Sequence, residues 1–311
     1  MNSERTVKTP TPRERVRIAI NHERPDHVPR GEFYVEEAFL NRFLPQYAKA
    51  SYGEKLRLLI EEFRLDLVTI RVDDQKEEEG LREIERWASQ TEYFVMALVD
   101  GVFWRPIDYL SLEDFLVRIC RGDHDILQMI QMKKVKVKQL VKRCLSQGAD
   151  GCMIGDDLAF NGGPFLSPKE LRKTVFPELR EIAEAVRANR GIAFLHSCGN
   201  LTELIEPILT LGFNGLHGLA PSAGNDPLSI RQRTKGKLCL MGVFQVDFLV
   251  SSELEVLKET ILQSLGAEGG YILGSSEGLS KNTPLSSVRT LYKLEKYPYF
   301  SKQVGQIDIQ L

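Results

Sequence analysis

Short apolar runs recur along the chain, and between them lie longer segments whose apolar residues repeat at helical spacing. Most of the runs are apolar at nearly every position, which is typical of strands that are buried on both faces. Eight runs predict strands, at residues 31–35, 66–72, 93–99, 149–155, 191–196, 213–217, 238–243 and 270–274. Helical spacing predicts helices at residues 53–64, 111–121, 125–146, 168–189, 201–211, 252–265 and 285–295.

The alternation of strand and helix, repeated about eight times, predicts an α/β fold with a single (β/α)8 TIM barrel. A doubly wound open sheet is the alternative. Such a sheet would carry a glycine-rich phosphate turn after its first strand, and the sequence contains neither GxGxxG nor GxxxxGK[ST]. The polar residues 1–10 predict a disordered N-terminal lead, and residues 11–311 are predicted to form one domain. Thr11, Pro12 and Glu14 fit the start of a helix with a capping box.

Composition and charge narrow the class of protein. Lys and Arg total 41 and Asp and Glu total 43, so the formal net charge is −2, which argues against nucleic acid as a partner. No apolar run approaches the ~18 residues that a transmembrane helix needs, and the first residues lack the apolar stretch of a secretory signal. Five cysteines, an odd and sparse number at this length, argue against a disulfide scaffold. We therefore expect a cytoplasmic enzyme that does not bind membranes.

Active sites of such barrels form at the carboxyl ends of the strands. Polar side chains follow most of the predicted strands and should therefore gather at that end. They are Glu36, Glu37, Asp73, Asp74, Asp156, Asp157, residues 196–200, His217, Gln245, Asp247 and residues 275–277. The mouth of the barrel is thus predicted to be rich in carboxylates and to carry two of the five histidines. Asp73 and Asp74 are better interpreted as a solvated helix start, because the acidic segment QKEEEG follows them.

The segment His196-Ser197-Cys198-Gly199-Asn200 is the most distinctive local feature. His196 and Cys198 can both face one metal ion if the chain turns at Gly199, and zinc takes nitrogen and thiolate ligands. A third ligand is required, and Glu277 can supply it only if the fifth and eighth strands project inward together. The alternative is a structural histidine that donates to a loop carbonyl, beside a small buried cysteine.

Three further residues are candidates for catalysis. Asp156 and Asp157 can bind a cation, orient a substrate amine or act as a general base. Alternatively, one of these aspartates caps a turn and the other faces water. His217 ends the sixth predicted strand, where it is either a site residue or a core histidine with its hydrogen bonds satisfied.

Several segments resemble the uroporphyrinogen decarboxylase superfamily. They are TPRERVRIAINHERPDHVPRGEF, the block from GCMIGDD through FLHSCGN to APSAGNDP, LCLMGVFQVDFLV and GGYILGSSEGLSKNTPLSSV. The likeness spans residues 11–297 and implies one (β/α)8 barrel. True decarboxylases of this superfamily carry an arginine-rich N-terminal loop of the form RQAGRY, which binds the porphyrinogen carboxylates. The matching segment here, GEFYVEEAFLNRF, is acidic and would repel them.

The cobamide-dependent methyltransferases form the other branch, which this sequence resembles more closely. Their zinc site has the form His-x-Cys with a distant second cysteine, so the resemblance implies that His196 and Cys198 are zinc ligands. Glu277 stands where the distant cysteine would be, and a carboxylate can bind zinc. The resemblance further implies a corrinoid cofactor carried by a separate partner protein and a small-molecule methyl acceptor. Asp156 or Asp157 would orient the substrate or a ligand.

Three functions follow from the sequence. The first is a corrinoid-linked methyltransferase that uses a zinc site built from His196, Cys198 and Glu277. The second is a uroporphyrinogen decarboxylase-like decarboxylase, which rests on the resemblance in fold alone. The third is a non-catalytic barrel that binds a small molecule or a corrinoid protein. The sequence leaves the methyl donor, the methyl acceptor and the oligomeric state open.

Overall fold

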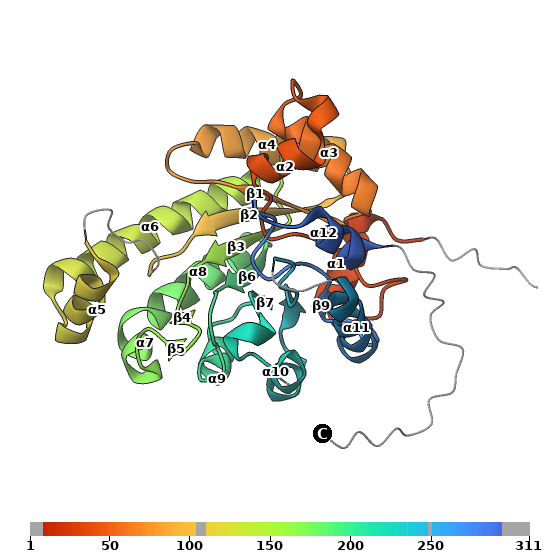
Figure 1. Cartoon of the computed structure of the whole chain (residues 1–311). Coiled ribbons are helices and arrows are strands. Elements are labelled where there is room, and N and C mark those ends of the chain that lie inside the picture. Colours follow the sequence, from red (N-terminus) through yellow and green to blue (C-terminus); the bar gives the residue numbers. More distant parts are fainter. Residues whose placement is uncertain (1–8, 104–109, 235, 248–250, 294–311) are drawn as a thin grey trace, which may run out of the picture.

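Seven parallel strands form one curled sheet at the centre of the protein, with helices around it (Figure 1). The computed structural model describes residues 9–103, 110–234, 236–247 and 251–293. Residues 1–8 of the predicted disordered lead lie outside the described residues. The strands, in their order across the sheet, are β1 (Leu67–Arg71), β2 (Phe94–Asp100), β3 (Gly151–Gly155), β6 (Ile192–His196), β7 (Gly215–His217), β8 (Cys239–Met241) and β9 (Tyr271–Ile272). Each of them matches a predicted run.

The gap between β1 and β9 is bridged by residues 30–35, where the first strand was predicted. This segment forms only isolated parallel bridges, from Gly31 to Leu67 of β1 and from Arg30 and Val35 to Leu273 and Leu279 beyond β9. The pairing with β1 does not continue as a regular ladder beyond Gly31, and there the Thr69 hydroxyl donates to the carbonyl of Glu32. The prediction of a full strand here was wrong. The segment nevertheless occupies the place of the first strand, so the (β/α)8 class is confirmed.

Helices follow the strands and cover the outside of the sheet (Figure 1). They are α1 (Pro12–Ile20), α2 (Glu37–Phe43), α3 (Tyr52–Phe63), α4 (Glu77–Gln90), α5 (Leu112–Arg121), α6 (His124–Ser146), α7 (Pro168–Thr174), α8 (Phe176–Ala188), α9 (Ile205–Leu209), α10 (Pro227–Thr234), α11 (Ser251–Ile261) and α12 (Leu285–Tyr292). Short single turns add Pro45–Tyr47, Pro221–Ala223 and Leu262–Gly266. A two-residue hairpin of β4 (Ala159–Phe160) and β5 (Gly163–Pro164) follows β3.

Side-chain caps explain where some of these helices begin. Thr11 accepts from the amide of Glu14 while the Glu14 carboxylate accepts from the amide of Thr11, so the predicted capping box at α1 is confirmed. Ser167 likewise caps α7 by accepting from the amide of Glu170. The single helix predicted at 168–189 is divided into α7 and α8 at Val175.

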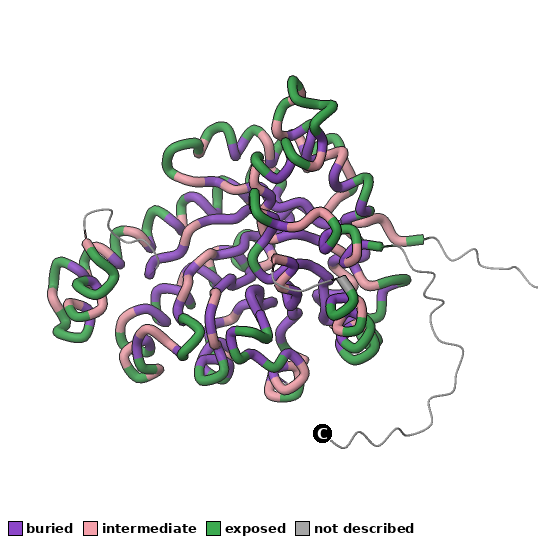
Figure 2. The backbone as a smooth tube through the Cα atoms, in the orientation of Figure 1, coloured by how far each residue is buried: buried purple, intermediate pink, exposed green. Residues whose placement is uncertain are grey.

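Alternate residues of the strands face two separate apolar regions, as expected for a sheet buried on both faces. Side chains such as Met96, Met153 and Phe194 fill the interior of the barrel, and all three are fully buried. The opposite faces pack against the surrounding helices, and Figure 2 shows buried residues along the strands and exposed residues on the outer turns of the helices. A filled interior leaves the carboxyl ends of the strands as the place where a site can open.

Two expectations about the class of protein can be compared with the fold. All five cysteines are free, as predicted for a chain without a disulfide scaffold. Within the described part of the chain, no helix combines the length and the apolar character that crossing a bilayer requires.

Candidate metal centre

A sharp turn after β6 brings His196 and Cys198 together. Gly199 makes this turn with a φ of +84°, a left-handed conformation that favours glycine. A Cβ at this position would also lie 2.4 Å from the backbone carbonyl of Ala159 in the neighbouring hairpin, so no larger residue fits. Because the chain folds back here, the Cys198 Sγ lies 3.5 Å from the His196 Nε2.

Asp157, in the loop after β3, completes a group of three possible metal ligands. Its Oδ1 accepts a hydrogen bond of 2.8 Å from the amide of Cys198 and lies 3.6 Å from the His196 Nε2. The three ligand atoms of Asp157, His196 and Cys198 all lie within 4.8 Å of one another. These distances place an oxygen, a nitrogen and a sulfur around one point, where a single cation can contact all three.

Glu277 lies apart from this group, on the rim of the barrel mouth. Its side chain is exposed and accepts a hydrogen bond of 3.1 Å from the Gln245 amide. Burial raises the pKa of the Cys198 thiol, and the charges of Asp157 and Glu277 raise it further. The structure therefore brings Asp157 together with His196 and Cys198, and the role of Glu277 as a ligand stays a prediction.

His217 lies directly behind His196, inside the barrel. The two Nδ1 atoms are 2.7 Å apart, and the His217 Nε2 lies 3.1 Å from the carbonyl oxygen of Ser275. Burial lowers the pKa of His196 to about 3 and the pKa of His217 well below its ordinary value. Both rings are therefore neutral at physiological pH, which is the state that metal binding requires of a histidine.

Phe33, from the segment that replaces the first strand, covers both imidazole rings. Its ring stacks on His196 with centroids 3.9 Å apart and on His217 with centroids 4.8 Å apart. The sequence reasoning missed Phe33 because an apolar residue within an apolar run is indistinguishable from ordinary core. The neighbouring Glu32 was a usable signal, because a carboxylate inside a buried run needs partners.

Glu32 is buried and receives hydrogen bonds from two hydroxyls, those of Ser275 and Tyr292. Burial raises the pKa of Glu32 to about 7. Ser275 thus contacts Glu32 through its hydroxyl and His217 through its carbonyl, so the two buried residues share one anchor.

Asp156 has different surroundings from its neighbour Asp157. Its side chain is fully buried, and its carboxylate accepts from the amides of Val102 and Phe103 at 2.9 Å. These bonds hold the start of the loop after β2 against β3. The catalytic role predicted for Asp156 stays a prediction, and the contacts described here are those of a residue that fixes a loop.

Comparison with known proteins places the chain in a family. The model of the uroporphyrinogen decarboxylase family matches residues 115–296, more than half of the sequence. The chain belongs to the uroporphyrinogen decarboxylase family. No curated protein sequence matches it.

Two solved structures of enzymes share the fold of this family member. A methyltransferase from Methanosarcina mazei superposes with a TM-score of 0.75 and 16% sequence identity, over 91% of this chain and 97% of that chain. A 3-keto-D-glucoside 4-epimerase from E. coli superposes with a TM-score of 0.52 and 13% identity, over 86% of this chain and 98% of that chain. At such low identities the likeness shows the fold alone.

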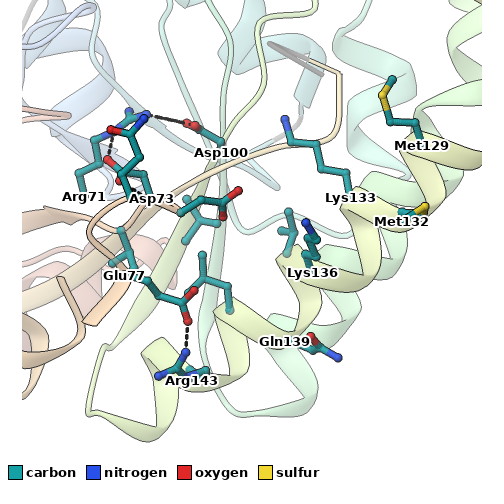
Figure 3. A pocket seen from close by; sticks show the side chains of 16 residues that line it. Arg71, Asp73, Glu77, Asp100, Met129, Met132, Lys133, Lys136, Gln139 and Arg143 are labelled. Carbon is teal, nitrogen blue, oxygen red and sulfur yellow. Dashed lines mark hydrogen bonds and ion pairs between the residues drawn. The ribbon is translucent and has the colours of Figure 1, made fainter. Parts of the chain in front are cut away.

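The barrel of this family member also has a groove of about 940 Å³ between β1, β2, α4 and α6 (Figure 3). Four acidic and four basic side chains line it, namely Asp73, Asp74, Glu77, Asp100, Arg71, Lys133, Lys136 and Arg143. Arg71 pairs with Asp73 and Asp100, and Arg143 pairs with Glu77. Because acids and bases line the groove in equal number, it does not select a ligand of one charge.

Asp73 also accepts hydrogen bonds from the amides of Gln75 and Lys76, directly before α4. This arrangement agrees with the interpretation of Asp73 and Asp74 as part of a solvated helix start.

Proposed function

We propose that this chain is a zinc-dependent methyltransferase that moves a methyl group between a corrinoid, carried by a partner protein, and a small acceptor. The observation that carries the proposal is the spacing of the three ligand atoms. Two ligands of a tetrahedral zinc ion, with bonds of about 2.0–2.3 Å, lie roughly 3.3–3.7 Å apart. The His196 Nε2 lies 3.5 Å from the Cys198 Sγ and 3.6 Å from the Asp157 Oδ1, which fits this range.

The donor set also suits a catalytic zinc ion. Asp157, His196 and Cys198 offer one oxygen, one nitrogen and one sulfur, and a set of three protein ligands leaves the fourth position open to a substrate. Without a metal, burial raises the pKa of the Cys198 thiol, so the sulfur keeps its proton. Metal binding requires the thiolate and would therefore release a proton.

Each side chain of the site has a distinct task in this proposal. Bound zinc would supply a Lewis acid that lowers the pKa of an acceptor thiol. His196, Cys198 and Asp157 would hold the ion, and the amide of Cys198 fixes Asp157 by donating to its Oδ1. Phe33 stacks on the His196 ring and limits its motion. A corrinoid presented at the barrel mouth would supply the methyl chemistry, while the chain supplies position and electrostatics.

Methyl transfer from methylcobalamin to a panel of small thiols tests the proposal. We expect the full chain, loaded with zinc, to produce methylated thiol, and Cys198→Ser to lower the rate at least about 100-fold. Lys136→Ala, on α6 in the groove, is the matched control and should leave the rate unchanged. Absence of transfer by the zinc-loaded chain, in the presence and absence of candidate corrinoid proteins, would contradict the proposal.

Incubation with uroporphyrinogen separates the decarboxylase alternative. We expect no loss of substrate carboxylate, because the acidic segment GEFYVEEAFLNRF stands where the decarboxylases carry an arginine-rich loop, and it would repel the substrate carboxylates. Release of carbon dioxide would favour decarboxylation. A chain that binds zinc but transforms neither substrate would match the non-catalytic barrel.

A further inference from the structure

We infer that His217 is a positioning residue, which holds the His196 ring in the one tautomer that presents a lone pair to Cys198 and Asp157. This inference rests on the proposed metal site and assigns a role to a residue that does not contact the ion. It follows from the direction of two hydrogen bonds inside the barrel.

The first bond joins the His217 Nε2 to the carbonyl oxygen of Ser275, at 3.1 Å. A carbonyl oxygen can only accept, so the Nε2 of His217 must carry the proton. In a neutral imidazole one nitrogen donates and the other accepts. The Nδ1 of His217 is therefore an acceptor.

The second bond joins that acceptor to the Nδ1 of His196, at 2.7 Å. Since one of the two nitrogens must donate, the proton lies on the Nδ1 of His196. The Nε2 of His196 is then left with a free lone pair, and this atom faces Cys198 and Asp157. The backbone of Ser275, in the segment after β9, thus sets which nitrogen of His196 is available to a metal.

The opposite arrangement of protons is unfavourable at Ser275 and would block the metal position at His196. A proton on the Nδ1 of His217 would leave its Nε2 lone pair facing the lone pairs of the Ser275 carbonyl, in a site without exposure to water. It would also move the proton of His196 to Nε2, where it would occupy the position of the ion.

Packing prevents the two rings from turning to escape this arrangement. Phe33 stacks on both imidazoles, within about 20° of parallel. Gly242, at a φ of +74°, approaches so closely that a Cβ there would lie 2.3 Å from the His217 Nε2. A rotated His217 ring would lose the bonds to Ser275 and to His196 together.

A matched pair of substitutions separates positioning from simple packing. In His217→Asn, the side-chain oxygen takes the place of Nδ1 and still accepts from His196. In His217→Gln, the amide takes the place of Nε2 and still donates to Ser275, but nothing accepts from His196. We expect His217→Gln to weaken zinc affinity about 10–100-fold and His217→Asn to weaken it less than about 3-fold, as measured by competition with a chelator. Equal losses in both variants would overturn the inference.

The tautomer can be measured directly on the metal-free wild-type chain. Long-range 1H–15N correlation spectra distinguish a protonated ring nitrogen from an unprotonated one, and we expect His196 with the proton on Nδ1. A His196 ring with the proton on Nε2 would overturn the inference, even if the substitutions behave as expected. Because this spectrum needs no metal and no substrate, it decides the tautomer of His196 even if the chain proves to bind no zinc.

Discussion

Two sides of the barrel mouth differ in how their polar side chains are arranged. On the side formed by β3, β6 and β7, Asp157, His196 and Cys198 converge on one point. On the side formed by β1 and β2, the groove in Figure 3 is lined by acids and bases that pair with each other, such as Arg71 with Asp100. The carboxylate, imidazole and thiol of the first side can all bind a cation, whereas Arg71 and Asp100 already neutralise each other.

Burial explains much of this difference. His196 and His217 are buried, so the direction of every hydrogen bond they make is fixed by the need to satisfy each nitrogen. The side chains of Arg71 and Asp100 are 35% and 43% exposed, so water can replace either partner and the pair is worth little. A substitution on the side of Asp157, His196 and Cys198 should therefore have a large effect on stability or zinc affinity, and a substitution in the groove should have a small one.

The largest effect on stability is expected from Gly199→Ala. The new Cβ would require the turn to keep a left-handed φ and would meet the backbone of Ala159, which cannot yield as a flexible side chain would. We expect a loss of about 3–5 kcal/mol in the free energy of unfolding, measured by urea denaturation. Gly122→Ala, at the end of α5, is the matched control. It has a similar φ of +75° with nothing within 4 Å, and should cost only about 1 kcal/mol. Equal losses would show that the β6 turn is not tightly packed.

The identity of the third ligand should give the next largest effect. If Asp157 binds the ion, Asp157→Asn replaces a carboxylate by a neutral amide and should weaken zinc affinity about 100-fold or more. Glu277→Gln, on the rim, should change it less than about 3-fold, because its contribution is a charge at a distance. Calorimetric titration with zinc compares the two. A larger loss in Glu277→Gln would assign the third ligand to Glu277, as the sequence resemblance implied.

The buried carboxyl group of Glu32 should change how the stability of the fold depends on pH. The pKa of Glu32 in the folded chain is about 7, above its ordinary value of 4.5, so the folded state takes up a proton as the pH falls from 8 to 5. This uptake stabilises the fold at low pH. Glu32→Gln removes this proton uptake. The free energy of unfolding at pH 5 minus that at pH 8 should therefore be about 2–3 kcal/mol lower in Glu32→Gln than in the wild type.

His196 and His217 have the opposite effect on the pH dependence of stability. Their pKa values are lowered by folding, so the unfolded chain binds protons first and stability falls as the pH drops below about 6.5. Glu32 offsets part of this loss. Urea denaturation at both pH values, with the exposed Glu277→Gln as control, measures the difference, and an unchanged pH dependence in Glu32→Gln would contradict the account.

The smallest effect is expected in the groove. Lys136→Ala removes one of four basic side chains that line it, opposite an equal number of acidic ones. We expect the free energy of unfolding to change by less than about 0.5 kcal/mol and zinc affinity to stay the same. A marked loss of zinc binding in this variant would show that the groove and the metal side are coupled.

Much of the fold could be predicted because buried parallel strands leave a clear apolar pattern. Each of the seven strands of the sheet matches a predicted run. The predicted first strand, residues 31–35, was not predicted correctly, because this segment forms only isolated bridges to residues far away in the sequence. Local sequence carries no trace of such a contact between distant residues.

The candidate site was predictable only as far as it is local. His196 and Cys198 are two residues apart, so a turn was enough to bring them together. Asp157 was predicted to bind a cation, orient a substrate amine or act as a base, but it was not placed in the zinc ligand set, because its distance to β6 depends on how the loop after β3 folds. Phe33 was missed because stacking on a histidine is not visible in an apolar run.

The zinc content of the full chain, purified without chelator and supplied with zinc, shows whether Asp157, His196 and Cys198 form a metal site. We expect about one equivalent of tightly held zinc per chain, lost in Cys198→Ser and retained in Lys136→Ala. Less than about a tenth of an equivalent in the wild type, or an undiminished content in Cys198→Ser, would contradict this expectation.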